Sequence, residues 1–395
     1  MAKADILICG GGIIGITVAK ELLNQGYENI VIIEKEKELG LHASGRNSGV
    51  LHSGIYYASD TLKAKSCIKG NLLMQEYCKK KGLPLLNSGK VIVAKDDSEL
   101  KTLYILFKRA LNNGAKVKLI DEKELSTIEP NAKTYEKALF SNNTAVVSPK
   151  LILQSLYNDV VSSGKAKIFL NTEFQGIKAT RSVLTNIGEI EFNIFINAGG
   201  AFSDKIAHAF EVGQNYKLIP FKGIYKKLRS DKANFVNGNI YPVPDIRNPF
   251  LGIHFTKSID RNVYLGPTAI PAFGRENYGI VKGMDIEAGE ILLREAILFF
   301  ENPKFRSLAL IEPRKYLSRF FYRDARELVK DLHPCDVMPS SKAGIRPQLV
   351  DWKDKELVMD FKIIKDGSCI HILNAISPAF TCSLDFAKFV VNEYI

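Results

Sequence analysis

A glycine-rich turn near the N-terminus limits the first part of this chain to one kind of local fold. Gly10, Gly12 and Gly15 form the pattern GxGxxG. A short apolar run at 4–9, typical of a buried strand, precedes the turn, and a helical pattern at 16–25 follows it. Strand, glycine turn and helix in this order predict a βαβ unit that binds a dinucleotide.

Each part of this unit has a physical task. Gly10 permits the tight turn, Gly12 lets the backbone approach a pyrophosphate, and Gly15 lets the helix pack closely on the strand. The N–H groups at the start of the helix, including those of Ile13 and Ile14, are placed to bind the phosphates.

The region after the helix indicates which dinucleotide is bound. A strand pattern at 30–33 ends at Glu34, where an acid accepts hydrogen bonds from ribose hydroxyls and favours FAD or NAD over NADP. A loop rich in glycine and serine follows at 39–49, where a NAD-binding half would enter another helix directly. Such a loop suits FAD, a longer cofactor that lies extended across the sheet. The cofactor contacts predicted after Glu34 are Lys35, Ser44, Arg46, Asn47, Ser48 and Gly49.

Further motifs extend along nearly the whole chain. They are SGRNSGVLHSGIYY at 44–57, INAGG at 196–200, YPVPD at 241–245, GIHFT at 252–256, AGIRPQ at 343–348 and NAISPA at 374–379. With these motifs the chain resembles the FAD-dependent L-2-hydroxyglutarate oxidases and dehydrogenases of the D-amino-acid-oxidase-like superfamily. It departs from their pattern at 146–149, which lacks an acidic residue typical there, and at Phe380, where a small residue is usual.

The resemblance implies an α/β protein, α+β overall, with a Rossmann-like FAD-binding domain. A substrate domain with an antiparallel or mixed sheet would be interleaved with it. The FAD domain would comprise 1–88, 147–219 and 336–395, and the substrate domain 89–146 and 220–335. This organisation predicts that the chain crosses repeatedly between the two domains.

Local patterns agree with this organisation. They predict strands at 90–94, 168–174 and 190–197 and helices at 97–113 and 149–163. The resemblance adds cofactor contacts at Phe174, Ala198, Gly199, Gly344, Arg346, Ser377, Pro378 and Ala379.

Oxidation of a 2-hydroxy acid requires a base for the hydroxyl proton, while the flavin accepts the hydride. Histidine is the natural base near neutral pH. His52 and His254 lie in HSGIYY and GIHFT, so each is a candidate base. His52 is slightly favoured because its segment follows the cofactor loop directly, and His254 would then orient the substrate. A structural hydrogen bond is the alternative role for either residue.

A dicarboxylate substrate also needs cationic anchors, and arginine binds a carboxylate through two parallel hydrogen bonds. Arg346, through the resemblance, is predicted close to the flavin and substrate. Lys222, at the start of the substrate domain, and Arg275 are further candidates, and Tyr57 and Tyr225 would add hydroxyl donors. The alternative for each cation is a surface salt bridge.

Two other flavoprotein functions stay open. An amine or amino-acid oxidase would share the fold and the cofactor, but it gains less from a second cation or a base histidine. An FAD protein acting on RNA requires a Lys/Arg stripe interleaved with exposed aromatics, and the lysines here are dispersed, with 305–326 the best candidate stretch.

Composition limits the partners and the location. The net charge of +11 comes mostly from dispersed lysines, so no specific nucleic-acid partner is expected. There is no signal peptide, no long apolar run and no CxxC among the six cysteines, which predicts reduced thiols, no metal site and a cytoplasmic protein. The expected partners are a small dicarboxylate and an electron acceptor, either oxygen or a membrane quinone. A quinone would involve peripheral contact with the cytoplasmic face of the inner membrane.

Overall fold

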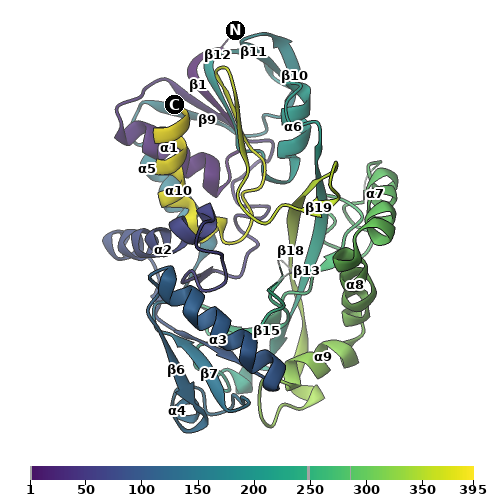
Figure 1. Cartoon of the computed structure of the whole chain (residues 1–395). Coiled ribbons are helices and arrows are strands. Elements are labelled where there is room, and N and C mark those ends of the chain that lie inside the picture. The colour runs from purple at the N-terminus through teal and green to yellow at the C-terminus, as the bar shows by residue number, and fades with distance from the viewer. Residues whose placement is uncertain (1, 247–249, 285) are drawn as a thin grey trace. The chain divides into compact units, whose positions relative to one another are not determined.

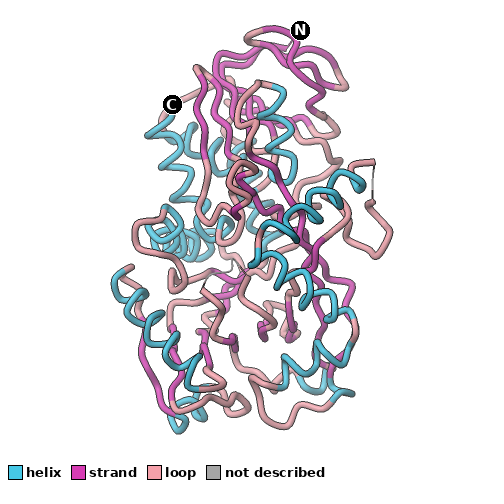
Figure 2. The backbone as a smooth tube through the Cα atoms, turned by 45° about the vertical axis from the view of Figure 1, so that its right-hand side comes forward, coloured by secondary structure: helices cyan, strands magenta, loops and turns pink. Residues whose placement is uncertain are grey.

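In a computed structural model, which describes residues 2–246, 250–284 and 286–395, the chain divides into two compact units (Figure 1). Unit 1 comprises Met1–Asn47, Pro149–Pro220 and Arg346–Ile395, and unit 2 comprises Ser48–Ser148 and Phe221–Ile345. Each unit combines helices with strands, so the mixed α/β class is confirmed (Figure 2). The functional FAD and substrate domains, with the bounds expected from the sequence, stay a prediction.

Unit 1 is built on an eight-stranded sheet, counted over the described residues. Its main path runs through β10 (Phe174–Ala179), β11 (Ser182–Thr185), β12 (Gly188–Asn197), β1 (Ala2–Cys9), β2 (Ile30–Ile33) and β9 (Ala166–Phe169). β21 (Cys369–Ile372) pairs in parallel with the end of β12, and β20 (Ile363–Asp366) pairs with β21. β1 is parallel to both of its neighbours, β12 and β2. Residues 6–9 of this central strand are apolar and buried on both faces, as is usual for a parallel strand inside a sheet.

The α-helices of unit 1, in the part that the structure describes, are α1 (Ile13–Asn24), α5 (Pro149–Val161), α6 (Ser203–Ala209) and α10 (Ala379–Tyr394). α1 packs against α5 and α10, and the three lie together in Figure 1. A stripe of buried residues four apart, Ile14, Val18 and Leu22, forms one side of α1. This spacing places the three side chains on one helix face, which explains why α1 is buried there.

Unit 2 contains most of a second, mixed sheet. Within this unit the order is β16 (Val263–Gly266), β15 (His254–Lys257), β14 (Asn239–Pro242), β5 (Lys90–Val93), β7 (Lys137–Ser141) and β6 (Val117–Asp121). β14 and β5 are parallel, whereas the other neighbours in this set are antiparallel. β17 (Ile270–Pro271) pairs with β13. A small separate sheet is formed by β3 (Val50–Leu51), β8 (Ala145–Val147) and β4 (Leu85–Leu86).

Two long strands continue from one unit into the other along the chain. They are β13 (Tyr216–Leu228) and β18 (Val337–Asp351). Within unit 1, the end of β18 pairs with β19 (Glu356–Leu357).

The described α-helices of unit 2 are α2 (Leu62–Lys81), α3 (Asp97–Asn112), α4 (Glu122–Ile128), α7 (Ala288–Glu301), α8 (Pro303–Ile311) and α9 (Ser318–Arg326). α3 begins where the Asp96 carboxylate accepts a hydrogen bond from Glu99 N–H (2.9 Å). α2 ends at Gly82, whose φ of +63° is the left-handed conformation that favours glycine after a helix.

The central strands of unit 2 are buried on both faces. On one face, Val91, Ile240 and Phe255 belong to an apolar cluster. On the other face, Ile92 and Tyr241 pack in the cluster that contains the apolar side of α3. Side chains alternate along a strand, so each polar residue in β5, β14 or β15 also points to one of these two buried faces.

Most elements predicted from the sequence are confirmed to within a few residues. A single strand at 168–174 is wrong: β9 ends at Phe169 and β10 begins at Phe174. Asn171 between them has a φ of +51°, and its N–H donates to Glu36 O, while Thr172 N–H donates to Glu34 O. These bonds hold the chain between β9 and β10 against the segment that follows β2. Across the described residues, none of the helices is both long enough and apolar enough to span a bilayer.

Candidate functional site

The predicted glycine turn connects β1 to α1 in unit 1. Gly10 has a φ of +114°, and a Cβ atom there would collide with the carbonyl of Ala198. A Cβ atom at Gly15 would collide with the carbonyl of Gly10. Gly12 is the N-cap of α1 and brings no side chain to the first N–H groups of the helix. The turn therefore requires glycine and leaves the positive end of the helix dipole open to an anion.

Glu34 and Ser44 lie directly at this turn. Glu34 Oε2 accepts a hydrogen bond from Gly11 N–H (2.9 Å), and Glu34 Oε1 accepts one from Glu36 N–H (3.0 Å). Ser44 Oγ accepts a hydrogen bond from Ile13 N–H (2.9 Å). The acid after β2 and the serine-rich loop are thus held against the glycine turn, and their contacts with a cofactor stay a prediction.

The serine-rich loop is held by its own side chains. Arg46 Nε donates to the carbonyl of Leu41 (2.6 Å), and Asn47 Nδ2 donates to the carbonyl of Ser44 (3.0 Å). Both residues were predicted to contact the cofactor, and here they fix the loop that carries Ser44.

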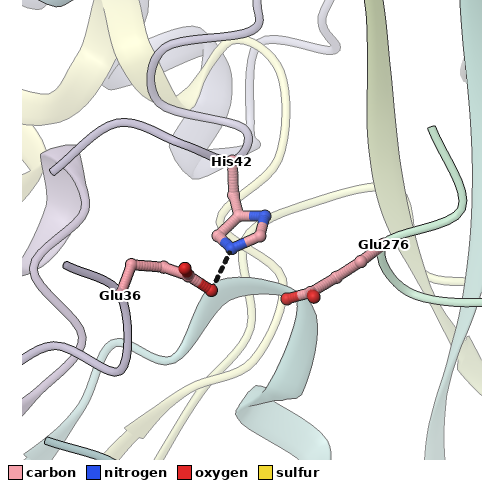
Figure 3. Close-up of side chains that lie close together, drawn as sticks. All are labelled: Glu36, His42 and Glu276. Atoms are coloured by element: carbon pink, nitrogen blue, oxygen red, sulfur yellow. Dashed lines mark hydrogen bonds and ion pairs between the residues drawn. The ribbon is translucent and has the colours of Figure 1, made fainter. Parts of the chain in front are cut away.

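Lys35 takes part in a charged group at the start of the same loop. Glu36 Oε1 is 2.5 Å from Lys35 Nζ and 2.9 Å from His42 Nε2, and Figure 3 shows the latter contact. Hydrogen bonds from Lys35 and His42 hold the pKa of Glu36 below its ordinary value. Lys35 Nζ also lies 5.2 Å from the ring centre of Phe202. A cofactor contact by Lys35 stays a prediction.

A second small-residue segment lies beside the glycine turn. Ala198 and Gly199 follow β12, and Ala198 N–H donates to the carbonyl of Cys9 (2.9 Å). Gly199 N–H is held by Asn197 Oδ1 (3.1 Å). The ends of β1 and β12 therefore bring their glycine-rich turns together, as expected at the carboxyl edge of a parallel sheet.

The remaining predicted cofactor residues are distributed over both units. In unit 1, Phe174 opens β10 and its ring packs against Phe195 and Phe210. Ser377, Pro378 and Ala379 lie at the N-terminus of α10. Unit 2 contains Ser48, Gly49 and Gly344. Their contacts with a cofactor stay predictions.

The unit 1 residues fit a dinucleotide. Glycines stand where a Cβ atom would collide, the N-cap residue of α1 brings no side chain to the helix start, and a carboxylate follows β2. The pyrophosphate of FAD would lie on the N–H groups of α1, and the ribose hydroxyls would donate to Glu34.

The candidate base His52 is in unit 2, in the segment after β3. Its side chain is buried, with 8% of the residue exposed. Its backbone carbonyl accepts hydrogen bonds from Asn71 Nδ2 (2.9 Å) and Cys67 Sγ (3.4 Å), both on α2. The position of the HSGIYY motif is thereby fixed by α2.

The other candidate base, His254, opens β15 and is also buried. Its Nδ1 is 2.9 Å from the carbonyl of Gly252, so Nδ1 carries the hydrogen and Nε2 is the acceptor in the neutral ring. The ring stacks on Tyr241 with centres 3.8 Å apart. Burial is the main cause that lowers the pKa of His254 to about 3, and therefore the ring is neutral near pH 7.

Two predicted substrate anchors have buried partners within unit 2. Lys222 Nζ donates to Asn277 Oδ1 (2.8 Å) and to the carbonyl of Gly279 (2.6 Å), and burial lowers its pKa. Arg275 forms a two-pronged pair with Glu287, through Nε to Oε2 (2.9 Å) and Nη2 to Oε1 (2.7 Å). The surface salt bridge considered from the sequence is wrong for Arg275, because both partners are buried.

The other predicted anchors are placed as follows. Tyr225 is buried, and Lys342 Nζ lies 5.1 Å from its ring centre. Tyr57 packs edge-on against Tyr56 with ring centres 6.5 Å apart. Arg346 begins the last segment of unit 1, and its Nη2 is 3.5 Å from Gln348 Oε1. Contact of these residues with a substrate stays a prediction.

Lys90 is a polar residue that the sequence reasoning passed over. The sequence predicts it only as part of the strand at 90–94, yet its side chain is 1% exposed and faces Tyr56 and Tyr241. The available signal was its position: a lysine directly preceding three β-branched residues, Val91-Ile92-Val93, in a strand buried on both faces.

Comparison with known proteins supplies the family. The sequence model of a family described as FAD dependent oxidoreductase matches residues 5–391. The chain is 34% identical to the mitochondrial L-2-hydroxyglutarate dehydrogenase of Bos taurus, over 98% of this chain and 88% of that protein. It is also 34% identical to the L-2-hydroxyglutarate dehydrogenase of Indibacter alkaliphilus, over 96% of each chain. The structure of L-alpha-glycerophosphate oxidase from Mycoplasma pneumoniae with FAD bound has a TM-score of 0.78 and 23% identity, covering 99% of this chain and 94% of that one.

Proposed function

The chain belongs to the FAD-dependent oxidoreductase family, and on that premise we propose that it oxidises L-2-hydroxyglutarate to 2-oxoglutarate. The observation that carries this proposal is the near full-length likeness to proteins named L-2-hydroxyglutarate dehydrogenase, both animal and bacterial. Since the likeness includes the HSGIYY and GIHFT segments, it covers both candidate base histidines and not only the nucleotide turn.

FAD is held by the residues of unit 1. The glycine turn and the start of α1 would take its pyrophosphate, and Glu34 its ribose hydroxyls. Bound FAD supplies the acceptor for the hydride from the substrate α-carbon.

The protein must remove the hydroxyl proton and hold the two carboxylates. His254 is neutral near pH 7 and presents Nε2 as an acceptor, which suits a base. Its low pKa makes it a weak proton acceptor in the free protein, and an adjacent substrate carboxylate would raise that pKa. His52 remains the other candidate, and Arg346 is the proposed anchor for a carboxylate.

Anaerobic reduction of the flavin tests this function. The purified holoenzyme is mixed with L-2-hydroxyglutarate, and the flavin absorbance is followed, with the D-enantiomer, glycine and L-proline in parallel. We expect bleaching by the L-enantiomer alone. Bleaching by glycine or L-proline in its place would assign the chain to amino-acid oxidation. His52→Asn and His254→Asn then identify the base. Loss of the base should lower the rate of flavin reduction more than it lowers the affinity for the substrate.

We also propose that the electrons pass to a quinone while the protein contacts an anionic membrane through α7. Leu293 and Phe300, seven residues apart on one face of this helix, are 62% and 75% exposed, and Ile286 precedes them at the same spacing. Exposed Lys282 and Lys304 flank the helix in sequence. Apolar side chains with neighbouring lysines suit an anionic lipid surface.

Vesicle flotation tests the membrane contact. The holoenzyme should float with vesicles that contain phosphatidylserine, and Leu293→Glu/Phe300→Glu should remain at the bottom of the gradient while its flavin is still reduced by substrate. Ile187→Glu, at a 61% exposed position in unit 1, is the matched control and should float. Equal flotation of both variants would exclude α7 as the contact.

A further inference from the structure

A polar group of side chains lies on one face of the unit 2 sheet. In β5, Lys90 and Ile92 face the same side, because side chains alternate along a strand. Ile92 is paired with Tyr241 of the parallel strand β14. His254 of β15 stacks on Tyr241, so it shares this face as well. The opposite face of the same strands contributes to an apolar cluster.

Lys90 is the unusual member of this group. Its Nζ lies 4.6 Å from the ring centre of Tyr56 and 5.1 Å from that of Tyr241. This Nζ donates no hydrogen bond to any residue that the structure describes. Burial lowers the pKa of Lys90 to about 7. Within the described residues no carboxylate pairs with this amine, so it lacks the counter-charge that buried cations normally have.

The neighbouring tyrosines carry hydroxyls that are equally unmatched. Tyr56 OH and Tyr241 OH are buried and make no hydrogen bond within the described chain. Burial raises the pKa of Tyr241, and the nearby Thr256 lowers it in part. The hydroxyls of the two residues are nevertheless not joined by a hydrogen bond. Buried polar groups in native proteins almost always have partners, so these donors indicate a bound species.

We infer that Lys90, Tyr56 and Tyr241, named here the Lys90 cluster, form a binding site for one carboxylate of the substrate. This inference deepens the proposed function and rests on it. A carboxylate has only acceptor atoms and a negative charge, and the Lys90 cluster offers an ammonium and two hydroxyl donors. The site would explain selection of a dicarboxylate over a monocarboxylate, because a neutral group placed there leaves the ammonium uncompensated.

The charges that face Lys90 agree with an anionic ligand. His254 is neutral near pH 7, and burial raises the pKa of both tyrosines above the ordinary value. Cys67 is the remaining titratable group that acts on Lys90. A carboxylate would therefore be the group that neutralises Lys90 and raises its pKa.

Binding of glutarate to the holoenzyme tests the site without turnover. Glutarate has both carboxylates but no hydroxyl to oxidise, and its dissociation constant is measured by titration calorimetry. We expect Lys90→Met to weaken binding about 10- to 100-fold, the range for loss of a charge-assisted hydrogen bond. Tyr56→Phe and Tyr241→Phe keep the rings and should each weaken it about 3- to 10-fold.

Matched controls separate binding from folding. Lys118→Met removes an exposed lysine of the same sheet, which pairs with Glu124, and should leave the glutarate affinity unchanged. Lys90→Met should melt no lower than the wild type, because it removes a buried charge that lacks a counter-ion. The inference is overturned if Lys90→Met melts far below the wild type while Tyr56→Phe and Tyr241→Phe bind glutarate with unchanged affinity. That result would show that Lys90 has a structural role.

The pH dependence gives an independent readout. In the wild type, glutarate affinity should fall about tenfold per pH unit above pH 7, since the carboxylate needs the protonated amine. Lys90→Met should abolish this slope, and Cys67→Ala should keep it. If L-2-hydroxyglutarate reduces the flavin but Lys90→Met binds glutarate like the wild type, the site is refuted and the function stands. If glutarate binds through Lys90 but L-2-hydroxyglutarate does not reduce the flavin, the site stands and the function is refuted.

Discussion

The buried pair of Arg275 and Glu287 distinguishes a structural arginine from a substrate anchor. Both side chains are almost fully enclosed, with 2% and 7% exposed, and hydrogen bonds from both Nε and Nη2 of Arg275 join them. Arg275→Met leaves the Glu287 carboxylate buried and without this partner, and Arg294 Nη1 is 4.0 Å from it. Removal of one partner from such a pair costs ~3–5 kcal/mol.

This cost is large enough to measure by thermal melting. At ~2–4 °C per kcal/mol for a domain of this size, the melting temperature should fall by ~6–20 °C. Circular dichroism and flavin fluorescence give two independent records of the transition. Arg323→Met is the control, because that arginine is 67% exposed and its pair with Asp324 should contribute ~1 kcal/mol at most.

A double variant separates stability from substrate binding. Arg275→Met/Glu287→Leu removes both charges and should recover most of the lost stability, because an apolar pair of similar volume often replaces a buried ion pair without loss. If Arg275 is only structural, the kcat/KM of this variant in the cold should stay within about threefold of the wild type. A stable double variant with a hundredfold lower kcat/KM would restore the substrate role. A single variant that melts with the wild type would refute the structural argument.

Three further predictions concern the cofactor turn and a buried acid. Gly10→Ala and Gly15→Ala should lose most of their FAD, seen as a lower flavin-to-protein absorbance ratio, whereas Gly289→Ala, with open space around it, should keep it. Glu34→Gln should weaken FAD binding about tenfold in a titration of the apoprotein, because a ribose hydroxyl loses a charged acceptor. Burial raises the pKa of Glu295 from 4.5 to about 8, so the stability it contributes is complete below pH 4.5 and is lost as the pH rises through 8. The melting temperature of Glu295→Gln should therefore fall less than that of the wild type between pH 5 and pH 8, and parallel curves would contradict the assignment.

The sequence predicts unit 1 better than unit 2, for a physical reason. The demand for glycine at Gly15 is local, because a Cβ atom there would meet the carbonyl of Gly10, and the φ of +114° at Gly10 belongs to the same short turn. A strand, a turn and a helix in series therefore reveal this part of the fold within a short segment. The split between β9 and β10 is not predicted because it involves hydrogen bonds from Asn171 and Thr172 to the carbonyls of Glu36 and Glu34, which follow β2 and are far away in sequence.

The site residues of unit 2 show the same limit. Arg275 resembles a surface or substrate-binding arginine until the fold brings Glu287 to it. The apolar residues after Lys90 place it in a buried strand, but the sequence does not show that Tyr56 and Tyr241, from distant segments, lie against its side chain. Burial of a charge is decided by distant segments, which a single sequence does not display.

The segmented composition of unit 1 has a consequence for synthesis of the chain. β12 pairs with β1 on one side and, over its last residues, with β21 on the other, and α10 packs against α1. A ribosome makes β1 long before β21 and α10, so the sheet of unit 1 keeps an open edge and α1 an uncovered face until those two elements are made. The second unit, which contains nothing beyond Ile345, has all of its residues earlier and can collapse first. In nascent chains arrested before Cys369, we therefore expect unit 2 to resist protease and unit 1 to be digested.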